Sequence, residues 1–571
     1  MNRFPVRGRI FPAFKKRMAS LLLASAAIIA LAFSAAYFLP GFYAVSWGAD
    51  TALVIGFEVV ENAPVLIQEG EIYLPVEIFQ DYLDPHFFWD EEEKIAVITT
   101  AHRLIHLDME KIATEINLSP VELQFPLRKE GNRLYLPALF LEEFLELAIN
   151  YYPETNTLTV DPAGASYLWG EVRSPSLKLR SGPGLHHPYY LRLRKGDRVL
   201  VEKAGSESGW LTVRTEQGIA GFLPSKEVVI LSSVSGERPS SPPGGAPPKE
   251  NPAQPLVLTW EFTYPNPDTK EIGEMPSLDI VIPTWFHLND SRGSLRNLAD
   301  PAYVHWARER GYSVWALVSN SFDPELTAEF LSSSSARKAA INQLLLFARL
   351  YRLEGFNLDF ENFHHRYREL YTQFVRELAV MCREAGLVLS VNVTVPEGEP
   401  YWSLCYDRAS LAREADYIVL MAYDEHWSSS PVAGSVSSLP WVEKNLSAVL
   451  KEVPAEKLIL GVPFYTRLWR IDEEGGDRSI SSRDYGMKRI EEILAGKDLE
   501  IGWDESNGQY LVEYREGECT FMAWLEESNS MERRLQLVNS YRLAGVAGWR
   551  RGLEKPEIWE LIENVLGKAS P

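Results

Sequence analysis

From Leu256 onward, short apolar runs rich in β-branched residues alternate with longer stretches that have helical spacing, such as residues 336–351 and 369–386. Buried parallel strands read as nearly continuous apolar runs, and helices connect them. Eight such units over about 315 residues predict an α/β fold, a (β/α)₈ or TIM barrel, with a doubly wound open sheet as the alternative. The eight runs begin near Leu256, Leu278, Tyr312, Gly355, Leu387, Tyr417, Lys457 and Gly545. The long connection 468–526 predicts a small inserted subdomain between the seventh and eighth strands.

Residues 52–162 contain a weak internal repeat. The motif "YLP" occurs at Tyr73 and again at Tyr135, and similar residues surround both copies. Each copy predicts a strand, a helix that begins at proline and a further strand. This small α+β repeat domain resembles the N-terminal domain of copper amine oxidases. The resemblance implies no copper, and we expect His86, His102 and His106 to be surface or satisfied histidines.

Residues 165–231 read as short alternating strands with the turns "RSGPG" and "KGD" and the motif "GxxGFL". This pattern predicts a small β-barrel and resembles bacterial SH3-like domains, which implies binding to the cell wall. A spacer without a ligand is the alternative. Residues 232–255 are rich in Pro, Ser and Gly and predict an extended linker.

The N-terminus differs from the rest of the chain. The first 49 residues carry a formal charge of +6, whereas the whole chain carries −21. Residues 1–17 are basic, and the uncharged apolar segment 18–40 is long enough to span a bilayer. This order predicts a cytoplasmic tail and a single-pass anchor with the remainder outside, or a cleaved signal peptide. Tyr37, Phe38, Tyr43 and Trp47 fit an interfacial aromatic belt.

Composition narrows the function classes. The acidic chain has no basic stripe and no attraction for nucleic acid. Cys382, Cys405 and Cys519 match no zinc or redox spacing, and we expect small buried hydrophobes. No metal cluster or phosphate loop is visible, so we expect no cofactor. We also expect a monomer.

Three polar residues interrupt the fourth apolar run, "EGFNLDFE". Side chains two apart on a strand face the same way, so Asn357, Asp359 and Glu361 are predicted to point into the barrel. Glu361 ends the strand, where barrel enzymes carry their active sites. Buried carboxylates are costly unless they are paired or have shifted pKa values, which favours chemistry over stability. Helix capping by Glu361 is the structural alternative.

This run resembles the signature of family 18 glycoside hydrolases, the chitinase family. The runs "YIVLMAYDEHW", "LGVPFY" and "AGVAGWRRG" resemble three further strands of that family in the same order, and the similarity covers 256–571. The style of the sequence is closest to the branch that acts on spore and cell-wall peptidoglycan. The sequence departs from the signature at Glu354 and at Asn357, each of which replaces Asp. Asn357 cannot titrate, so Asp359 is expected to be more permanently ionised.

The resemblance implies substrate-assisted, retaining hydrolysis. Glu361 is then the general acid and base. Asp359 orients the N–H of the substrate's acetamido group, and Tyr423 forms a hydrogen bond with the carbonyl of that group. The expected substrate-binding residues are Asn357, Asp424, Met421, Trp549, Trp285 and Tyr465. Core packing is the alternative for Tyr423, Met421 and Trp549, and helix capping for Asp424.

The sequence therefore predicts a membrane-anchored, extracytoplasmic glycosidase that cleaves β-1,4 bonds after N-acetylglucosamine in peptidoglycan. Its expected partners are an N-acetylated glycan polymer, the cell wall and the membrane. A chitinase, an inactive glycan-binding protein of lectin type and a structural wall protein are the alternatives.

Overall fold

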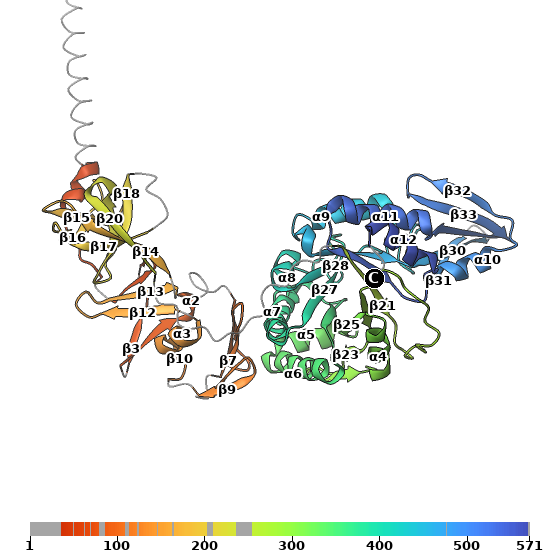
Figure 1. The fold of residues 1–571 in the computed structure, drawn as a ribbon, viewed down its shortest axis with the longest axis horizontal. Coiled ribbons are helices and arrows are strands. Elements are labelled where there is room, and N and C mark those ends of the chain that lie inside the picture. The colour runs from red at the N-terminus through yellow and green to blue at the C-terminus, as the bar shows by residue number, and fades with distance from the viewer. Residues whose placement is uncertain are drawn as a thin grey trace, which may run out of the picture. The chain divides into compact units, whose positions relative to one another are not determined.

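The computed structural model describes residues 36–48, 51–61, 63–68, 70–78, 86–108, 113–122, 125–145, 147–162, 165–202, 209–235, 254–474 and 477–568 (Figure 1). The chain divides into two compact units. The N-terminal unit comprises residues 1–85 and 123–242, and the barrel unit comprises residues 86–122 and 243–571.

The predicted repeat is visible in the N-terminal unit. The two "YLP" strands, β4 (Glu71–Pro75) and β11 (Arg133–Pro137), pair antiparallel, so that Leu74 lies opposite Leu136. A helix follows each of them, α2 (Val76–Ile78) and α3 (Ala138–Leu145). β3 (Leu66–Gln68) and β10 (Arg128–Glu130) complete this sheet. A second sheet contains β1 (Ala52–Ile55), β2 (Glu58–Val60), β12 (Leu147–Tyr152) and β13 (Thr157–Pro162).

A seven-stranded antiparallel sheet forms the rest of this unit, in the order β16-β15-β19-β18-β17-β14-β20. A buried ion pair between Arg214 and Asp161, with N–O distances of 2.7 and 3.0 Å, joins it to the preceding sheet. Alternating short strands were predicted here, and they are present. Their bounds are Ser166–Val172 (β14), Leu177–Arg180 (β15), Tyr189–Leu193 (β16), Arg198–Val201 (β17), Trp210–Thr215 (β18), Ala220–Pro224 (β19) and Val228–Ser235 (β20).

The barrel unit contains the predicted TIM barrel. Eight strands pair in parallel, and the pairing of β22 with β25 closes the circle. All eight apolar runs of the sequence became barrel strands, which rules out the open sheet. They are β21 (Leu256–Glu261), β22 (Ile280–Pro283), β25 (Ser313–Ser319), β26 (Gly355–Asp359), β27 (Val388–Thr394), β28 (Tyr417–Met421), β29 (Leu458–Pro463) and β35 (Gly545–Trp549). β23 (Phe286–Leu288) and β24 (Leu295–Asn297) form a hairpin beside β25.

Helices cover the outside of the barrel (Figure 1). The side chains of each strand divide between two apolar clusters. Phe356 and Leu358 of β26 belong to the cluster under the helices, whereas Trp260, Trp315 and Val419 belong to the cluster inside the barrel. The predicted sidedness of β26 is confirmed. The helices are α4 (Pro301–Glu309), α5 (Pro324–Ser332), α6 (Ser334–Tyr351), α7 (Arg368–Ala385), α8 (Arg408–Glu414), α9 (Leu439–Val449), α11 (Ser528–Tyr541) and α12 (Glu557–Leu566).

The predicted insertion between the seventh and eighth strands is a five-stranded antiparallel sheet with one helix, which projects from the barrel (Figure 1). A buried ion pair between Glu526 and Arg534 of α11 lies where the chain returns to the barrel. The insertion contains β30 (Tyr465–Glu474), β31 (Asp477–Gly486), α10 (Met487–Leu494), β32 (Glu500–Asp504), β33 (Gln509–Glu516) and β34 (Cys519–Leu525).

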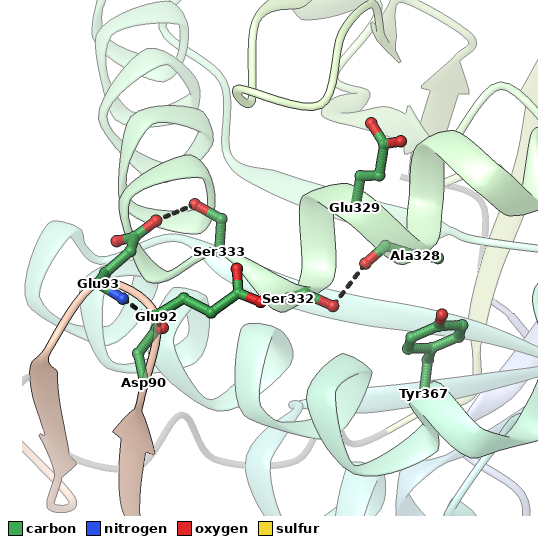
Figure 2. A pocket seen from close by; sticks show the side chains of 8 residues that line it. All are labelled: Asp90, Glu92, Glu93, Ala328, Glu329, Ser332, Ser333 and Tyr367. Carbon is green, nitrogen blue, oxygen red and sulfur yellow. Dashed lines mark hydrogen bonds between the residues drawn. The ribbon is translucent and has the colours of Figure 1, made fainter.

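The middle part of the segment predicted as a repeat domain, residues 86–122, belongs to the barrel unit and packs on the barrel. The end of the first strand of this part and the turn after it supply carboxylates to the first turn of α6, whose N–H groups have no partner within the helix. Asp90 accepts the N–H of Ser334 at 3.0 Å and Glu93 accepts that of Ser335 at 2.9 Å. Asp90 and Glu93 also line a hollow of about 320 Å³ (Figure 2). The strands are β5 (Phe87–Asp90), β6 (Ile95–Thr99), β7 (Leu104–Asp108), β8 (Ala113–Ile116) and β9 (Ser119–Glu122).

The predicted membrane segment 18–40 lies almost entirely outside the described residues. Within the described part of the chain, no helix has the length and apolar character needed to cross a membrane.

Candidate active site

The carboxyl end of β26 positions the predicted catalytic pair. Asp359 is buried at the end of the strand, and Glu361 is partly exposed two residues later. The side chain of Asn320, which follows β25, binds both backbone groups of Glu361. Its Oδ1 accepts the Glu361 N–H at 3.1 Å, and its Nδ2 donates to the Glu361 carbonyl at 2.6 Å. The backbone of Glu361 is therefore fixed by a neighbouring strand end.

Below this pair, buried side chains form a hydrogen-bond chain that ends on Asp359. The Trp260 indole N–H donates to Asn357 Oδ1 at 3.0 Å. Asn357 Nδ2 donates to Asn392 Oδ1 at 2.7 Å, and Asn392 Nδ2 donates to Asp359 Oδ1 at 2.8 Å. Since an indole N–H can only donate, it sets the orientation of both amides. Asp359 must therefore be an acceptor at the end of the chain.

The two carboxyl groups have raised pKa values. Burial raises the pKa of Asp359 to about 6, although the hydrogen bonds from Asn392 and Glu361 lower it. Burial raises the pKa of Glu361 well above its ordinary value, and the negative charges of Asp359 and Asp424 raise it further. Because a hydrogen bond between the two side chains lowers the pKa of Asp359 and raises that of Glu361, the proton of the pair resides on Glu361. Such a division suits an acid beside a carboxylate that is ionised above about pH 6.

Two further polar residues of the site, Tyr423 and Asp424, follow β28. Tyr423 is partly buried, and burial together with the charges of Asp359 and Glu361 raises its pKa well above the usual range, so its hydroxyl remains a donor. Asp424 has a left-handed backbone with φ of 61°. Its Oδ1 accepts from the Tyr465 hydroxyl at 2.6 Å and from Arg467 Nη2 at 3.1 Å. Tyr465 therefore holds Asp424 in place from a buried position.

The two tryptophans that were expected to bind substrate differ in their exposure to solvent. Trp549 ends β35 and is partly exposed, with its ring stacked towards Tyr423 at a centroid distance of 6.4 Å. Trp285, in contrast, is fully buried and packs edge-on against Tyr303 of α4. The expectation that Trp285 binds substrate is therefore wrong, because its side chain belongs to the core under the helices.

A cavity of about 640 Å³ opens above the pair. The predicted residues Glu361, Met421, Tyr423 and Asp424 line it. The remaining lining residues come from the end of β27, from the loops after β27 and β28 and from α9, and sequence reasoning missed them. They are Thr394, Val395, Glu397, Glu399, Trp402, Ser403, Trp427 and Trp441.

The hydrogen-bond partners of the pair were also missed. Ser390, Asn392 and Thr394 are polar at alternate positions of the otherwise apolar β27. This is the same period-two signal that identified Asn357 and Asp359, and it could have identified Asn392. No group of three or more His, Cys, Asp or Glu side chains within the described residues could hold a metal ion.

Comparison with known proteins supports the fold. Residues 313–554 match the glycosyl hydrolases family 18, and residues 54–160 match the copper amine oxidase N-terminal domain, which confirms both resemblances. The SH3-like resemblance of residues 165–231 stays a prediction.

Two curated Bacillus subtilis proteins are similar to this chain. The uncharacterized glycosylase YvbX is 24% identical over 285 residues, which cover 48% of this chain and 80% of that protein. A cortical fragment-lytic enzyme is 25% identical over 252 residues, which cover 43% of this chain and 58% of that protein. The chain thus spans under two thirds of the second relative.

The solved structure of a Bacillus cereus spore cortex-lytic enzyme superposes with a TM-score of 0.50 at 18% identity. The superposition covers 59% of this chain and 78% of that one, which shows a shared fold. The barrel of this chain therefore contains a domain that matches the glycosyl hydrolases family 18.

Proposed function

We propose that this protein hydrolyses the β-1,4 bond on the reducing side of N-acetylglucosamine in peptidoglycan. The observation that carries the proposal is the placement of Asp359 and Glu361 at one strand end, with Glu361 lining the cavity and Asp359 held as an acceptor. This arrangement provides one proton donor and one fixed carboxylate, which substrate-assisted hydrolysis of an N-acetylated sugar needs.

In the first step, the protonated Glu361 carboxyl gives its proton to the glycosidic oxygen. The acetamido oxygen of the sugar attacks the anomeric carbon as the bond to the leaving sugar breaks, and the bonding electrons leave with the protonated oxygen. The Asp359 carboxylate accepts the acetamido N–H and stabilises the positive oxazolinium ring. Such proton transfer contributes roughly 10²–10⁴ in rate.

In the second step, the Glu361 carboxylate takes a proton from water, and the hydroxide adds to the anomeric carbon. The bond between the anomeric carbon and the oxygen of the oxazolinium ring breaks, and its electrons restore the acetamido carbonyl. Two displacements leave the anomeric configuration retained. Tyr423 donates to the acetamido oxygen, and Trp549 offers an aromatic face to the apolar side of the sugar.

Support for peptidoglycan comes from the relatives named as cortical fragment-lytic and spore cortex-lytic enzymes. Chitin contains the same acetamido group and is the alternative substrate. A lectin would need no acid, whereas this site keeps Glu361 and holds its backbone on both sides with Asn320.

The test is digestion of purified peptidoglycan, and separately of chitin oligomers, followed by mass spectrometry of the reducing ends. We expect fragments that end in reducing N-acetylglucosamine, and we expect Glu361→Gln to abolish them while glycan binding remains. Glu397→Gln is the matched control, since it makes the same change in the same cavity away from the pair. Cleavage of chitin alone would overturn the substrate, and binding without any cleavage would support a lectin.

We also propose that the protein acts outside the cytoplasm. The basic residues before an uncharged segment of bilayer length support export, either with a retained anchor or with a cleaved signal. Fractionation of cells followed by N-terminal sequencing distinguishes the two: a chain that begins at Met1 in the membrane fraction is anchored. Recovery in the cytosol would contradict export.

A further inference from the structure

Residues 36–48 are docked on the hairpin formed by β15 and β16. The carbonyl of Gly41, within a short 3₁₀ helix at Leu39–Phe42, accepts from Lys178 Nζ and Arg180 Nη1, both at 3.0 Å. Gly41 packs so closely that a Cβ atom there would lie 1.8 Å from the carbonyl oxygen of Leu185. The segment then runs beside β16, where Val45 N–H donates to the Tyr189 carbonyl at 2.9 Å.

This docking leaves large apolar side chains in solvent. Phe42 is 73% exposed, Tyr43 58% and Leu185, at the tip of the hairpin, 61%. Tyr37, Phe38 and Leu39 are each about half exposed. Soluble proteins seldom expose so many large apolar side chains in one short segment unless another surface covers them. We call Tyr37, Phe38, Leu39, Phe42, Tyr43 and Leu185 the apolar patch.

The hairpin beneath the apolar patch is basic. Between Val172 and Gly196 the sequence has six Lys and Arg residues and no Asp or Glu, in a protein whose net charge is −21. Lys178 Nζ lies 5.2 Å from the ring centre of Phe42 and 4.4 Å from that of Tyr189. Basic and aromatic side chains therefore share one surface.

We propose that this surface binds the headgroup region of an anionic lipid bilayer. Aromatic side chains favour the membrane interface, and an anionic leaflet attracts Lys and Arg side chains near its surface. A soluble polyanion such as a wall polymer would engage the basic side chains but would leave the apolar patch in water. The apolar patch is what favours lipid.

The position of the surface in the chain supports the same partner. The uncharged apolar sequence that begins at Met18 runs to Leu39, and the contacts with the hairpin begin within it, where the ring of Tyr37 stacks on that of His186 with centroids 4.4 Å apart. The seven-stranded sheet is therefore tethered directly at the end of the apolar sequence. This step rests on the proposed export, whereas the apolar patch and the basic hairpin do not.

The test places a spin label at Leu185→Cys in the full chain, with Cys519→Ser to remove the partly exposed native thiol. Gln217→Cys, an exposed position on another turn of the same sheet, is the matched control. Each protein is reconstituted in vesicles of phosphatidylglycerol with phosphatidylcholine. We expect the label at residue 185 to collide with oxygen and to be several-fold less accessible to an aqueous nickel chelate than the label at residue 217.

Equal access of the chelate to both labels in vesicle-bound protein would overturn the lipid contact while leaving export and hydrolysis intact. Absence of any vesicle-bound protein would overturn both the contact and the anchor. A second variant reverses the exposed charges, Arg192→Glu, Arg194→Glu and Lys195→Glu. It should lose the protection at residue 185 and keep peptidoglycan hydrolysis. Unchanged protection in this variant, or equal protection in pure phosphatidylcholine, would refute the requirement for anionic lipid.

Discussion

Asp359 accepts a hydrogen bond from the side-chain amide of Asn392, and the orientation of this amide is fixed. Because the Trp260 N–H can only donate, Asn357 and Asn392 pass the donor direction along to the carboxylate. An aspartate at position 357 could exchange a proton with its neighbours, whereas asparagine cannot. Asn392 is therefore a positioning residue that keeps Asp359 ionised and oriented.

This chain of hydrogen bonds predicts the pH profile of kcat/KM. Activity should rise as Asp359 loses its proton near pH 6, and it should fall at higher pH as Glu361 loses its own. Asn392→Leu removes a hydrogen bond to a charged group, worth about 1.5–3 kcal/mol, so the acidic limb should move up by roughly 1–2 pH units. The measurement is kcat/KM across pH 4–9 on a soluble glycan.

The control is Ser390→Ala, which removes another polar contact of Asn357 without touching Asp359. It should leave the acidic limb in place. An unchanged limb in Asn392→Leu, with lower activity at every pH, would reduce Asn392 to a purely structural role.

The raised pKa of Glu361 also lowers the free energy of unfolding at high pH. Its pKa is higher in the folded state than in the unfolded state, so above the unfolded pKa the folded state binds more protons. Its contribution therefore destabilises the fold increasingly as pH rises through the folded pKa. We expect Glu361→Gln to raise the Tm of the barrel unit by a few degrees at pH 8 and by less at pH 4, as scanning calorimetry can measure. A lower Tm at both pH values would contradict this.

At this scale, sequence reasoning succeeded where the relevant residues are neighbours in the chain. The period-two spacing of Asn357, Asp359 and Glu361 predicted their common direction. Asn392 and Trp260 lie 33 and 97 residues from the groups they bind, and no local pattern reports such a distance. Trp285 was misassigned because a tryptophan just after a barrel strand can face either the cavity or the helices.

Among the elements, a buried ion pair lies where the insertion rejoins the barrel. Glu526 and Arg534 are 0% and 1% exposed, and two N–O contacts of 2.6 and 2.8 Å join them. Burial raises the pKa of Glu526 to about 7, although Arg534 lowers it. A pair of this kind contributes little net stability, but removing one partner strands the other charge.

We therefore expect Arg534→Met to destabilise the barrel unit by about 3–5 kcal/mol at pH 8, where the native protein has the ion pair. Because Glu526 of the native protein accepts a proton below about pH 7 and the ion pair is then lost, the difference between the two proteins should shrink at pH 6. The double variant with Glu526→Gln should recover most of the stability. Urea unfolding monitored by tryptophan fluorescence measures all three proteins. A loss below about 1 kcal/mol for the single variant would show that water or another side chain compensates the carboxylate.

At the scale of the whole molecule, the segment that matches the copper amine oxidase N-terminal domain, residues 54–160, is divided between the two compact units. The repeat placed residues 86–122 within one predicted domain, 52–162. In the structure these residues cover helices of the barrel, where Val97 and Leu104 are fully buried in its outer cluster. Sequence proximity could not reveal this, because the contacting residues lie more than 200 positions apart.

This division predicts the behaviour of a chain cut in its linker. A protease site inserted between Gly244 and Gly245 separates two fragments covalently, but the N-terminal fragment still carries the sheet that binds the barrel. Val97 and Leu104 remain buried, Asp90 and Glu93 remain on α6, and Lys338 still pairs with Glu115 at 2.9 Å. We expect the fragments to co-elute in size-exclusion chromatography in mild detergent after complete cleavage. Val97→Glu, which places a charge in the apolar contact, should release them. Immediate separation without that substitution would mean that the sheet does not hold the barrel in solution.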